Sequence, residues 1–306
     1  MKKFKKSRIS SDSWQLYAMC SIPMLLVFIF SYLPMFGIII AFKDYNYADG
    51  IFGSKWCGFK NFEFFLRSND FAKITWNTLY MNLIFILVGL ISALAVAILL
   101  YQIKSRSATK TFQTLLITPH FLSWVIAAYM VYALLNPEFG MLNVIRKTFG
   151  MEIIDWYSRP KSWPFILTIA YIWKHVGMDS VIYYAALMGI PQDLFEVADI
   201  DGASLWEKVK YIILPELKTL IIVLTILKLG NIFRADFGLF YQLPQNVGAL
   251  YSTTDVLDTY IFRTMRVYGN MGMSSAAGLL QSFVGFVLVI LTNTIVKKFD
   301  SDSSLF

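Results

Sequence analysis

The sequence predicts an all-α, polytopic membrane protein: a bundle of six transmembrane helices. Of its 306 residues, 57% are hydrophobic and only 15% are charged. Soluble domains have about 45–50% apolar and about 25% charged residues. The chain contains six apolar runs, and about 20 such residues suffice to cross a bilayer as a helix. Basic residues gather in alternate segments between the runs, which places both termini in the cytoplasm.

The six apolar runs are expected to form one membrane domain over residues 17–298. A basic segment, 1–16, precedes this domain, and a short tail, 299–306, follows it. The first run is nearly twice as long as a signal-peptide core and has no evident cleavage site, so we interpret it as an uncleaved span. The expected spans are Tyr17–Phe42, Asn77–Tyr101, Phe112–Leu135, Trp163–Ile190, Leu217–Phe240 and Ala276–Val296.

Basic residues define the predicted cytoplasmic side. They occur before the first span, after the second and after the sixth: Lys2, Lys3, Lys5, Lys6, Arg8, Lys104, Arg106, Lys110, Lys297 and Lys298. The segments 43–76, 136–162 and 241–275 are longer and carry both signs of charge, and they are expected outside. Long segments cross regardless of charge, so their basic residues do not alter this orientation.

Composition and motifs argue against several other classes. The net charge of +7 is modest and forms no basic stripe, so we expect no nucleic-acid partner. Cys20 and Cys57 lack the paired spacing of a metal site or a disulfide framework. His120 and His175 are the only histidines, too few for a His-rich metal site.

The most polar stretch of the second half, 191–216, lies between the fourth and fifth runs, on the predicted cytoplasmic side. We expect Pro191 to end the fourth span, and "QDLFEVADI" to form an amphipathic helix with Leu194, Val197 and Ile200 on one face. Gly202 permits a reversal. A second helix, "SLWEKVKYII", is expected to begin with a capping box between Ser204 and Glu207 and to stop at Pro215. Two such helices suit a docking element for a cytoplasmic partner.

This stretch resembles the EAA loop of ABC-importer permeases. That motif has E-A-A, three residues, G, nine residues, I, one residue and L-P. Both spacings match here without a gap, and the single departure is valine in the middle position. The matching residues, with the Asp201 that precedes the glycine, are Glu196, Val197, Ala198, Asp201, Gly202, Ile212, Leu214 and Pro215. The resemblance implies that this loop is the coupling helix, which seats in a cleft of the ATP-hydrolysing subunit.

The resemblance extends along nearly the whole chain. It includes "AFKDYNYADGIFGSKWCGFKNFEFF", "TPHFLSWV", "IWKHVGMDSVIYYAALMGIP", "DVLDTYIFR" and "AAGLLQSFVGFVLVILTN". These stretches look like sugar-import permeases of the maltose-permease type, in particular the subgroup that imports pectin, aldouronate or alginate fragments. The resemblance implies a multi-pass permease in a bacterial cytoplasmic membrane that takes an oligosaccharide substrate.

The same resemblance implies the partners. They are a second homologous permease, cytoplasmic ABC ATPase subunits and an extracellular solute-binding protein. ATP and Mg²⁺ would be bound by the ATPase, and this chain would have no cofactor and no catalytic role. In agreement, the sequence has no G-x-x-x-x-G-K-[ST] phosphate loop.

Polar and aromatic residues within the spans are candidates for the translocation pathway, because ionisable groups in a bilayer are costly. They are Lys174, His175 and Asp179 in the fourth span, Lys228, Asn231 and Arg234 at three-residue spacing in the fifth, and the aromatic residues Trp124, Trp173, Tyr183 and Tyr184. If the substrates are acidic oligosaccharides, Lys228 and Arg234 would attract their carboxylates. Alternatively, these charges fix helix packing or snorkel to the surface, and the aromatic residues only fill the bilayer core.

Other function classes stay open at this point. A secondary transporter would need its own ion-coupling residues and usually internal repeats, and we find no repeat. A membrane enzyme has only His175 and Asp179 as an acid–base couple, with no nucleophile or metal set. An ABC permease for a non-sugar solute fits the loop motif equally well.

Overall fold

The computed structural model describes residues 11–299, which divide into two compact units. The first unit contains the residues up to Leu66 and Thr264–Leu279, and the second contains Arg67–Arg263 and the residues from Leu280 onward. The N-terminal basic residues Lys2, Lys3, Lys5, Lys6 and Arg8, and the tail beyond 299, lie outside the described residues.

The first unit is dominated by one long apolar helical run, followed by small elements. The elements are α1 (Ser11–Val27), η1 (Phe28–Tyr32), η2 (Leu33–Phe42), β1 (Lys43–Asp44), α2 (Gly50–Gly53), β2 (Lys55–Trp56), α3 (Lys60–Leu66) and the first part of α15 (Met271–Phe299). The strands β1 and β2 pair antiparallel, with Lys43 opposite Trp56. This short pair is the one departure from an all-α fold in the part of the chain that the structure describes.

The first predicted span is confirmed as one helical run, Trp14–Phe42. Its winding changes from α through one π turn, Phe28–Tyr32, to a 3₁₀ segment that contains Pro34. Proline lacks the N–H that an α-helix would use, so a change of winding next to it is expected.

The second unit is built on two long helices, α4 and α8, which form its most extensive helix pair. Its elements are α4 (Phe71–Tyr101), α5 (Arg106–Ile117), η3 (Thr118–Phe121), α6 (Trp124–Leu135), α7 (Met141–Thr148), η4 (Trp156–Ser158), η5 (Pro160–Ser162), α8 (Trp163–Leu187), α9 (Gln192–Ile200), α10 (Leu205–Lys208), η6 (Val209–Ile213), α11 (Leu214–Gly230), α12 (Phe237–Gln242), η7 (Gly248–Leu250) and α13 (Tyr251–Thr254). Helix α14 (Leu257–Arg266) and helix α15 each have residues in both units.

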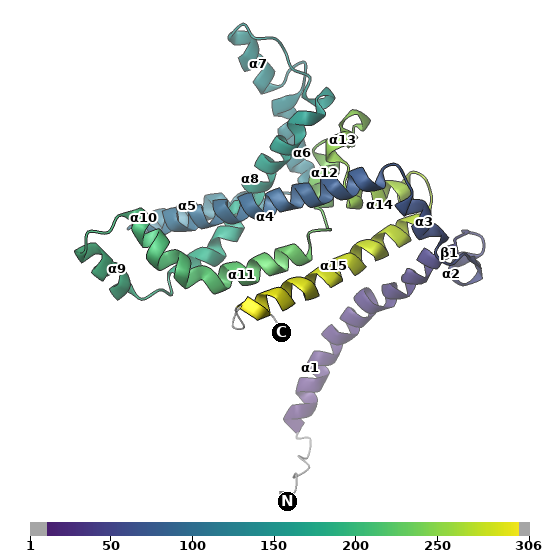
Figure 1. The fold of residues 1–306 in the computed structure, drawn as a ribbon, viewed down its shortest axis with the longest axis horizontal. Coiled ribbons are helices and arrows are strands. Elements are labelled where there is room, and N and C mark those ends of the chain that lie inside the picture. Colours follow the sequence, from purple (N-terminus) through teal and green to yellow (C-terminus); the bar gives the residue numbers. More distant parts are fainter. Residues whose placement is uncertain (1–10, 300–306) are drawn as a thin grey trace, which may run out of the picture. The chain divides into compact units, whose positions relative to one another are not determined.

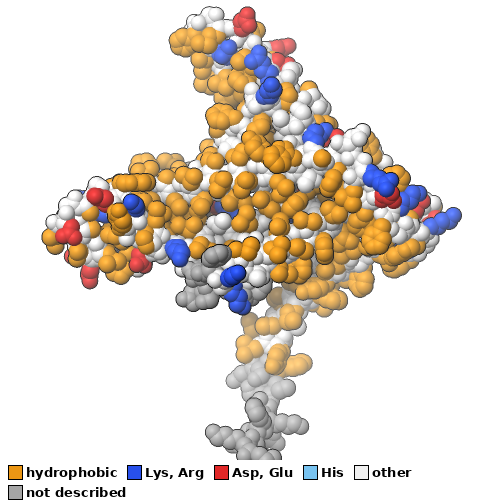
Figure 2. All heavy atoms as spheres, in the orientation of Figure 1, with side chains coloured by type: hydrophobic (Ala, Val, Ile, Leu, Met, Phe, Trp, Pro, Cys, Tyr) orange, Lys and Arg blue, Asp and Glu red, His pale blue; other side chains and the backbone are white. Residues whose placement is uncertain are grey.

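Two hydrophobic clusters hold the second unit together. One surrounds Phe85 and Leu239 and includes residues of α4, α6, α8 and α12. The other surrounds Leu187 and Ile213, where α4 and α8 meet the 191–216 loop. Elsewhere this unit exposes apolar side chains, and Figure 2 shows hydrophobic atoms over most of the visible face. Such a surface is expected for a protein surrounded by lipid.

Helix α5 lies against α8 at very short range. Gly177 faces the carbonyl of Leu116, and a Cβ at this position would lie only 1.9 Å from the carbonyl oxygen. Small residues of this kind allow helix backbones to approach closely within membranes. The contact fixes α5 on the side of α8 from which Lys174 also projects.

Helices α13 and α14 are tied to α4 by polar contacts. The amide of Asn77 donates to the carbonyls of Ser252 and Asp255, at 3.2 and 3.0 Å. The buried Asp255 also accepts a hydrogen bond from Arg263 at 2.5 Å. Burial alone would lower the pKa of Arg263, but the hydrogen bond and charge of Asp255 outweigh it, and the pKa is raised.

The third predicted span, Phe112–Leu135, is wrong as a single straight helix. The chain instead forms two helices, Arg106–Phe121 and Trp124–Leu135, at an angle of 98°. Pro119 removes one N–H from the first helix, and Ser123 caps the second by accepting a hydrogen bond from the N–H of Ile126. Together the two residues end one helix and start the next within a few positions.

The fifth predicted span is wrong at both ends. Helix α11 stops at Gly230 rather than Phe240, and residues 231–236 are not helical. At its start, Pro215 does not stop a helix: helical winding is continuous from Leu205 through a π turn at Val209–Ile213 into α11. The π turn again precedes a proline, as in the first span, because the wider winding accommodates the missing hydrogen bond.

The fourth span is confirmed with small changes. Helix α8 ends at Leu187, three residues before the predicted end, and Pro191 is the N-cap of α9 rather than the residue that ends the span. The second span begins at Phe71, six residues before the predicted start.

Four helices among residues 11–299 are long and apolar enough to cross a membrane: Trp14–Phe42, Phe71–Tyr101, Pro160–Leu187 and Met271–Lys298. The bent pair of α5–η3 and α6 adds a fifth crossing if it is counted as one span.

Candidate functional site

A polar cleft of about 430 Å³ opens between α4, α8, α11 and the non-helical segment 231–236. It brings together four of the predicted pathway residues, His175, Lys228, Asn231 and Arg234. Its full lining is Asn82, Phe85, Ile86, Tyr171, His175, Leu224, Leu227, Lys228, Asn231, Ile232, Arg234 and Asp236.

The ammonium group of Lys228 is neutralised by Asp179. The two side chains meet at 2.7 Å between α11 and α8, and both are about one-quarter to one-third exposed. The ion pair forms across two helices, as expected from the alternative interpretation in which these charges fix helix packing. The pair therefore joins α8 to α11 at the cleft.

Lys174 has a different role from the one expected of a pathway cation. Its side chain is buried, and its ammonium group donates to the carbonyls of Pro119, His120 and Leu122, with distances of 3.4 and 2.9 Å to the first two. It also lies 5.1 Å from the centre of the Trp124 ring. The carbonyl of Pro119 also accepts the N–H of Leu122 at 3.2 Å, whereas no backbone partner is recorded for the carbonyls of His120 and Leu122 among the described residues. An unsatisfied backbone group costs several kcal/mol in lipid. Lys174 supplies the missing donors.

Asp236 connects the bent span to the cleft. Its carboxylate accepts a hydrogen bond from the indole N–H of Trp124 at 2.7 Å and caps α12 through the N–H of Leu239 at 3.3 Å. The imidazole Nε2 of His175 lies 3.9 Å from the same carboxylate. Tyr171 packs against His175, with 4.7 Å between the ring centres.

Arg234 lies beyond the end of α11, so it is not on one helical face with Lys228 and Asn231 as predicted. The amide of Asn82 holds its segment in place by donating to the carbonyls of Ile232 and Arg234, at 2.8 and 3.2 Å. The Arg234 side chain is exposed at the cleft. Among the described residues no salt bridge is recorded for Arg234, although its charge acts on the carboxylate of Asp258, and Asp236 lines the same cleft.

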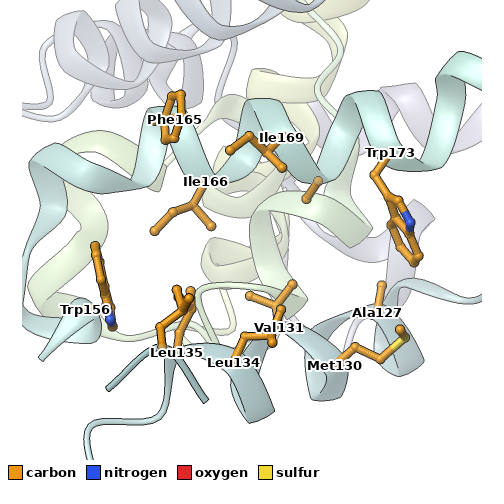
Figure 3. Close-up of a pocket in the computed structure, with 12 residues that line it drawn as sticks. Ala127, Met130, Val131, Leu134, Leu135, Trp156, Phe165, Ile166, Ile169 and Trp173 are labelled. Atoms are coloured by element: carbon orange, nitrogen blue, oxygen red, sulfur yellow. The ribbon is translucent and has the colours of Figure 1, made fainter. Parts of the chain in front are cut away.

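The remaining aromatic candidates lie away from the polar cleft. Trp173 lines a separate apolar pocket of about 470 Å³, which Figure 3 shows between α8, α6 and Trp156. Tyr183 is buried in the hydrophobic cluster next to the 191–216 loop. Tyr184 lines a third cleft at the end of α8.

Three polar cleft residues were not selected from the sequence: Asn82, Tyr171 and Asp236. Asp236 could have been selected from the sequence, because an acidic residue at the end of an apolar run is conspicuous. By contrast, Asn82 and Tyr171 are isolated in their helices, and only the packing of α4 on α8 places them together.

The 191–216 loop has the helix–turn–helix form that the sequence predicts. Gly202 has a φ of +73° at the reversal, a conformation that strongly favours glycine. The capping box between Ser204 and Glu207 is present, and the hydrogen bond from the Ser204 hydroxyl lowers the pKa of Glu207. Lys208 forms an ion pair with Asp199, which joins the two helices.

The loop exposes most of its motif residues. Phe195 is the side chain that anchors α9, whereas the predicted apolar face of Leu194, Val197 and Ile200 is solvent-exposed. Ile200 is 86% exposed, and Trp206 on α10 is 71% exposed. Glu196, Val197, Asp201, Gly202, Leu214 and Pro215 are exposed, and Ala198 and Ile212 are half-buried. In Figure 2 the charged side chains of this loop gather at the left end, over α9 and α10.

The second unit thus combines a cleft lined by charged and amide side chains with an exposed polar loop, on an otherwise largely apolar helical framework. Residues 85–301 match the family model described as "Binding-protein-dependent transport system inner membrane component". The chain belongs to this family, and it is therefore a multi-pass inner-membrane permease.

The chain is similar in sequence to known permeases and related proteins over nearly its full length. The chain is 33% identical over 295 residues to Protein LplB of Bacillus subtilis, covering 96% of this chain and 92% of that protein. It is 32% identical to the polygalacturonan/rhamnogalacturonan transport system permease protein YteP of the same organism, covering 90% and 85%.

Solved structures show the same fold. A chain of the bacterial alginate ABC transporter, in complex with an alginate pentasaccharide-bound periplasmic protein, matches with a TM-score of 0.84 and 31% identity. The match covers 94% of this chain and 96% of that chain. A second structure, of an ABC transporter involved in the import of the acidic polysaccharide alginate, gives a TM-score of 0.85.

The ion pair between Lys228 and Asp179 leads to a prediction about stability. Lys228→Met leaves a carboxylate without its cation, so we expect thermal unfolding of the purified protein at a lower temperature. Lys228→Met with Asp179→Asn should recover most of the loss. A double-mutant cycle is expected to give a coupling energy of about 0.5–1 kcal/mol, because both side chains are partly exposed.

This prediction would be contradicted if the destabilising effects of Lys228→Met and Asp179→Asn were simply additive, with no coupling energy. Asp199→Asn with Lys208→Met, at the more exposed ion pair of the 191–216 loop, is the matched control and should give a smaller coupling energy.

Proposed function

We propose that this chain is a permease subunit of an ATP-driven importer of oligosaccharides, with acidic, uronate-containing fragments as the preferred class. The polar cleft carries the proposal, because Arg234, for which no salt bridge is recorded among the described residues, lines it together with Asp236 and the neutral hydrogen-bonding groups of Asn82, Asn231 and Tyr171. Hydroxyl-rich sugars need such groups, and carboxylates are well matched by an arginine guanidinium. The names of the alginate and polygalacturonan relatives support the same substrate class.

We further propose six spans, with both termini in the cytoplasm. The span to be added to the five counted above would be α11, the fifth in chain order, whose helix continues without a break from α10 and η6 of the 191–216 loop. This arrangement puts Lys104, Arg106 and Lys110 on the same side as Lys297, Lys298 and the 191–216 loop, as the distribution of positive charge requires.

In this proposal the 191–216 loop is the coupling element and docks on a separate ATPase subunit. Its rigidity supports this role: a glycine reversal, a capping box and an ion pair hold α9 and α10 together. The exposed Ile200 and Trp206 would be covered by the partner. ATP and Mg²⁺ would act in that partner, and this chain would contribute no cofactor and no catalysis.

A second homologous permease and an extracellular solute-binding protein complete the proposed assembly. A rigid-body motion of the two permeases, driven by the ATPases through the loop, would switch the cleft from outward to inward access. A non-sugar solute is the remaining alternative, since a relative at 27% identity is the sn-glycerol-3-phosphate transport system permease protein UgpA of Escherichia coli. A stand-alone secondary transporter is not favoured, because the family depends on a binding protein.

The substrate class is tested by Arg234→Gln. Loss of an exposed charge-assisted contact of about 1 kcal/mol predicts a roughly fivefold decrease in uptake of uronate oligosaccharides. Uptake of neutral oligosaccharides, measured at equal expression, should fall less. Lys147→Gln, an exposed cation of the 136–162 segment, is the matched control.

If uptake of the acidic sugar were unchanged in Arg234→Gln and also in Lys228→Met, neither cation would contribute to the translocation pathway. Equal losses for acidic and neutral sugars would argue against recognition of the carboxylate.

The coupling role is tested by Ile200→Asp. Placing a charge in an apolar contact should reduce co-purification of the ATPase in mild detergent by at least about tenfold, while the second permease is retained. The control is Phe149→Asp, an exposed apolar residue of the 136–162 segment. Normal recovery of the ATPase with Ile200→Asp, or equal loss with both variants, would contradict docking at this loop.

A further inference from the structure

A third cleft, of about 710 Å³, lies where the ends of α4 and α8 meet the starts of α5 and α9. It is separate from the polar cleft, and no residue lines both. Three cations line it: Lys104, Arg106 and Lys110. Figure 1 shows α5 beside α4 at this end of the second unit.

The cations of this cleft have no acidic partner in the structure. The lining contains no carboxylate, and among residues 11–299 no ion pair is recorded for Lys104, Arg106 or Lys110. Asp193 follows Gln192 in the sequence but does not line the cleft. Three like charges around one hollow repel each other, and a bound anion would relieve the repulsion.

Neutral hydrogen-bonding groups complete the lining. The Gln192 amide donates to the hydroxyl oxygen of Tyr101 at 2.9 Å, which leaves the Tyr101 proton available to a ligand. Gln113 and Thr109 line the same cleft from α5. The Thr109 hydroxyl already donates to the Ser105 carbonyl at 3.1 Å, so Tyr101 and Gln113 are the neutral donors open to a phosphate oxygen. Both lysine and arginine bind phosphate well.

The residues around the cleft indicate whether the anion is a lipid headgroup or a free ion. The cleft lies at the ends of apolar helices, and two of these helices, α4 and α5, carry the exposed apolar side chains Leu99, Phe112 and Leu115. Charged headgroups meet acyl chains at this level of a bilayer, and basic pockets between transmembrane helices bind anionic headgroups. A free phosphate would gain nothing from the apolar side chains.

We propose that this cleft binds the headgroup of an anionic phospholipid, with Lys104, Arg106 and Lys110 around the phosphate. Leu99, Phe112 and Leu115 contact the acyl chains. A lipid held there fixes the start of the bent span next to α9, the first helix of the 191–216 loop.

The experiment uses the full chain, purified with its partner subunits, delipidated in a neutral detergent and analysed by native mass spectrometry. Phosphatidylglycerol is the probe, phosphatidylcholine the zwitterionic control and inorganic phosphate the free anion. We expect at least about tenfold more retained phosphatidylglycerol than phosphatidylcholine. Lys104→Gln/Arg106→Gln/Lys110→Gln should lose this preference, whereas Lys147→Gln/Arg159→Gln/Lys161→Gln should keep it.

A second measurement needs no variant: high salt should reduce the preference of the wild-type protein, because the headgroup contact is electrostatic. Equal retention of the two lipids, or equal loss in both triple variants, overturns the proposal. Displacement of the lipid by millimolar inorganic phosphate would make the site one for free phosphate. Retention only after the ATPase has been stripped away would make it a protein interface.

Discussion

The structure depends on how the backbone carbonyl groups at the break in one membrane span obtain hydrogen-bond donors. Pro119 and Ser123 divide the third apolar run into two helices at 98°, and among the described residues no backbone partner is recorded for the carbonyls of His120 and Leu122 at the break. Water is absent from the bilayer core, so the protein must supply the donors itself. Lys174 does so from α8, with one buried ammonium group that reaches three carbonyls. An intramembrane charge, costly alone, is thereby used as a donor to the backbone.

This constraint determines the position of the cleft. The bend begins α6 with Trp124, whose indole N–H binds Asp236. Asp236 in turn caps α12 and faces His175, so the non-helical segment 231–236 is fixed at both sides. Asn82 holds the carbonyls of the same segment from α4. Arg234 is consequently presented at the cleft, while the charge of Lys228 is neutralised by Asp179.

Much of the fold was predictable because hydrophobic length is a strong signal. The first, second, fourth and sixth runs became helices close to their predicted ranges, and the Gly202 reversal and the Ser204 capping box depend only on local chemistry. The third and fifth runs were wrong in detail, since hydropathy does not reveal a sharp bend or a helix that ends within an apolar stretch.

The prolines explain part of that failure. Pro215 looks like a helix stop in the sequence, yet a π turn carries the helix past it. The site was predicted only in part for a related reason. The sequence suggested that charges in the spans could fix helix packing but not which residues meet: Asp179 pairs with Lys228 across two helices, and Lys174 binds carbonyls rather than an acid. Such pairings depend on packing, which no local pattern contains.

The most direct test of the central role of Lys174 is hydrogen exchange of the purified protein over residues 118–127, comparing wild type with Lys174→Met. Without the ammonium group the carbonyls at the break lose their donor, so the first turn of α6 should open more often. We expect exchange there to rise by at least about tenfold, with little change in the 71–101 helix. Unchanged exchange across the break would contradict the account, because the bend would then be stable without the lysine.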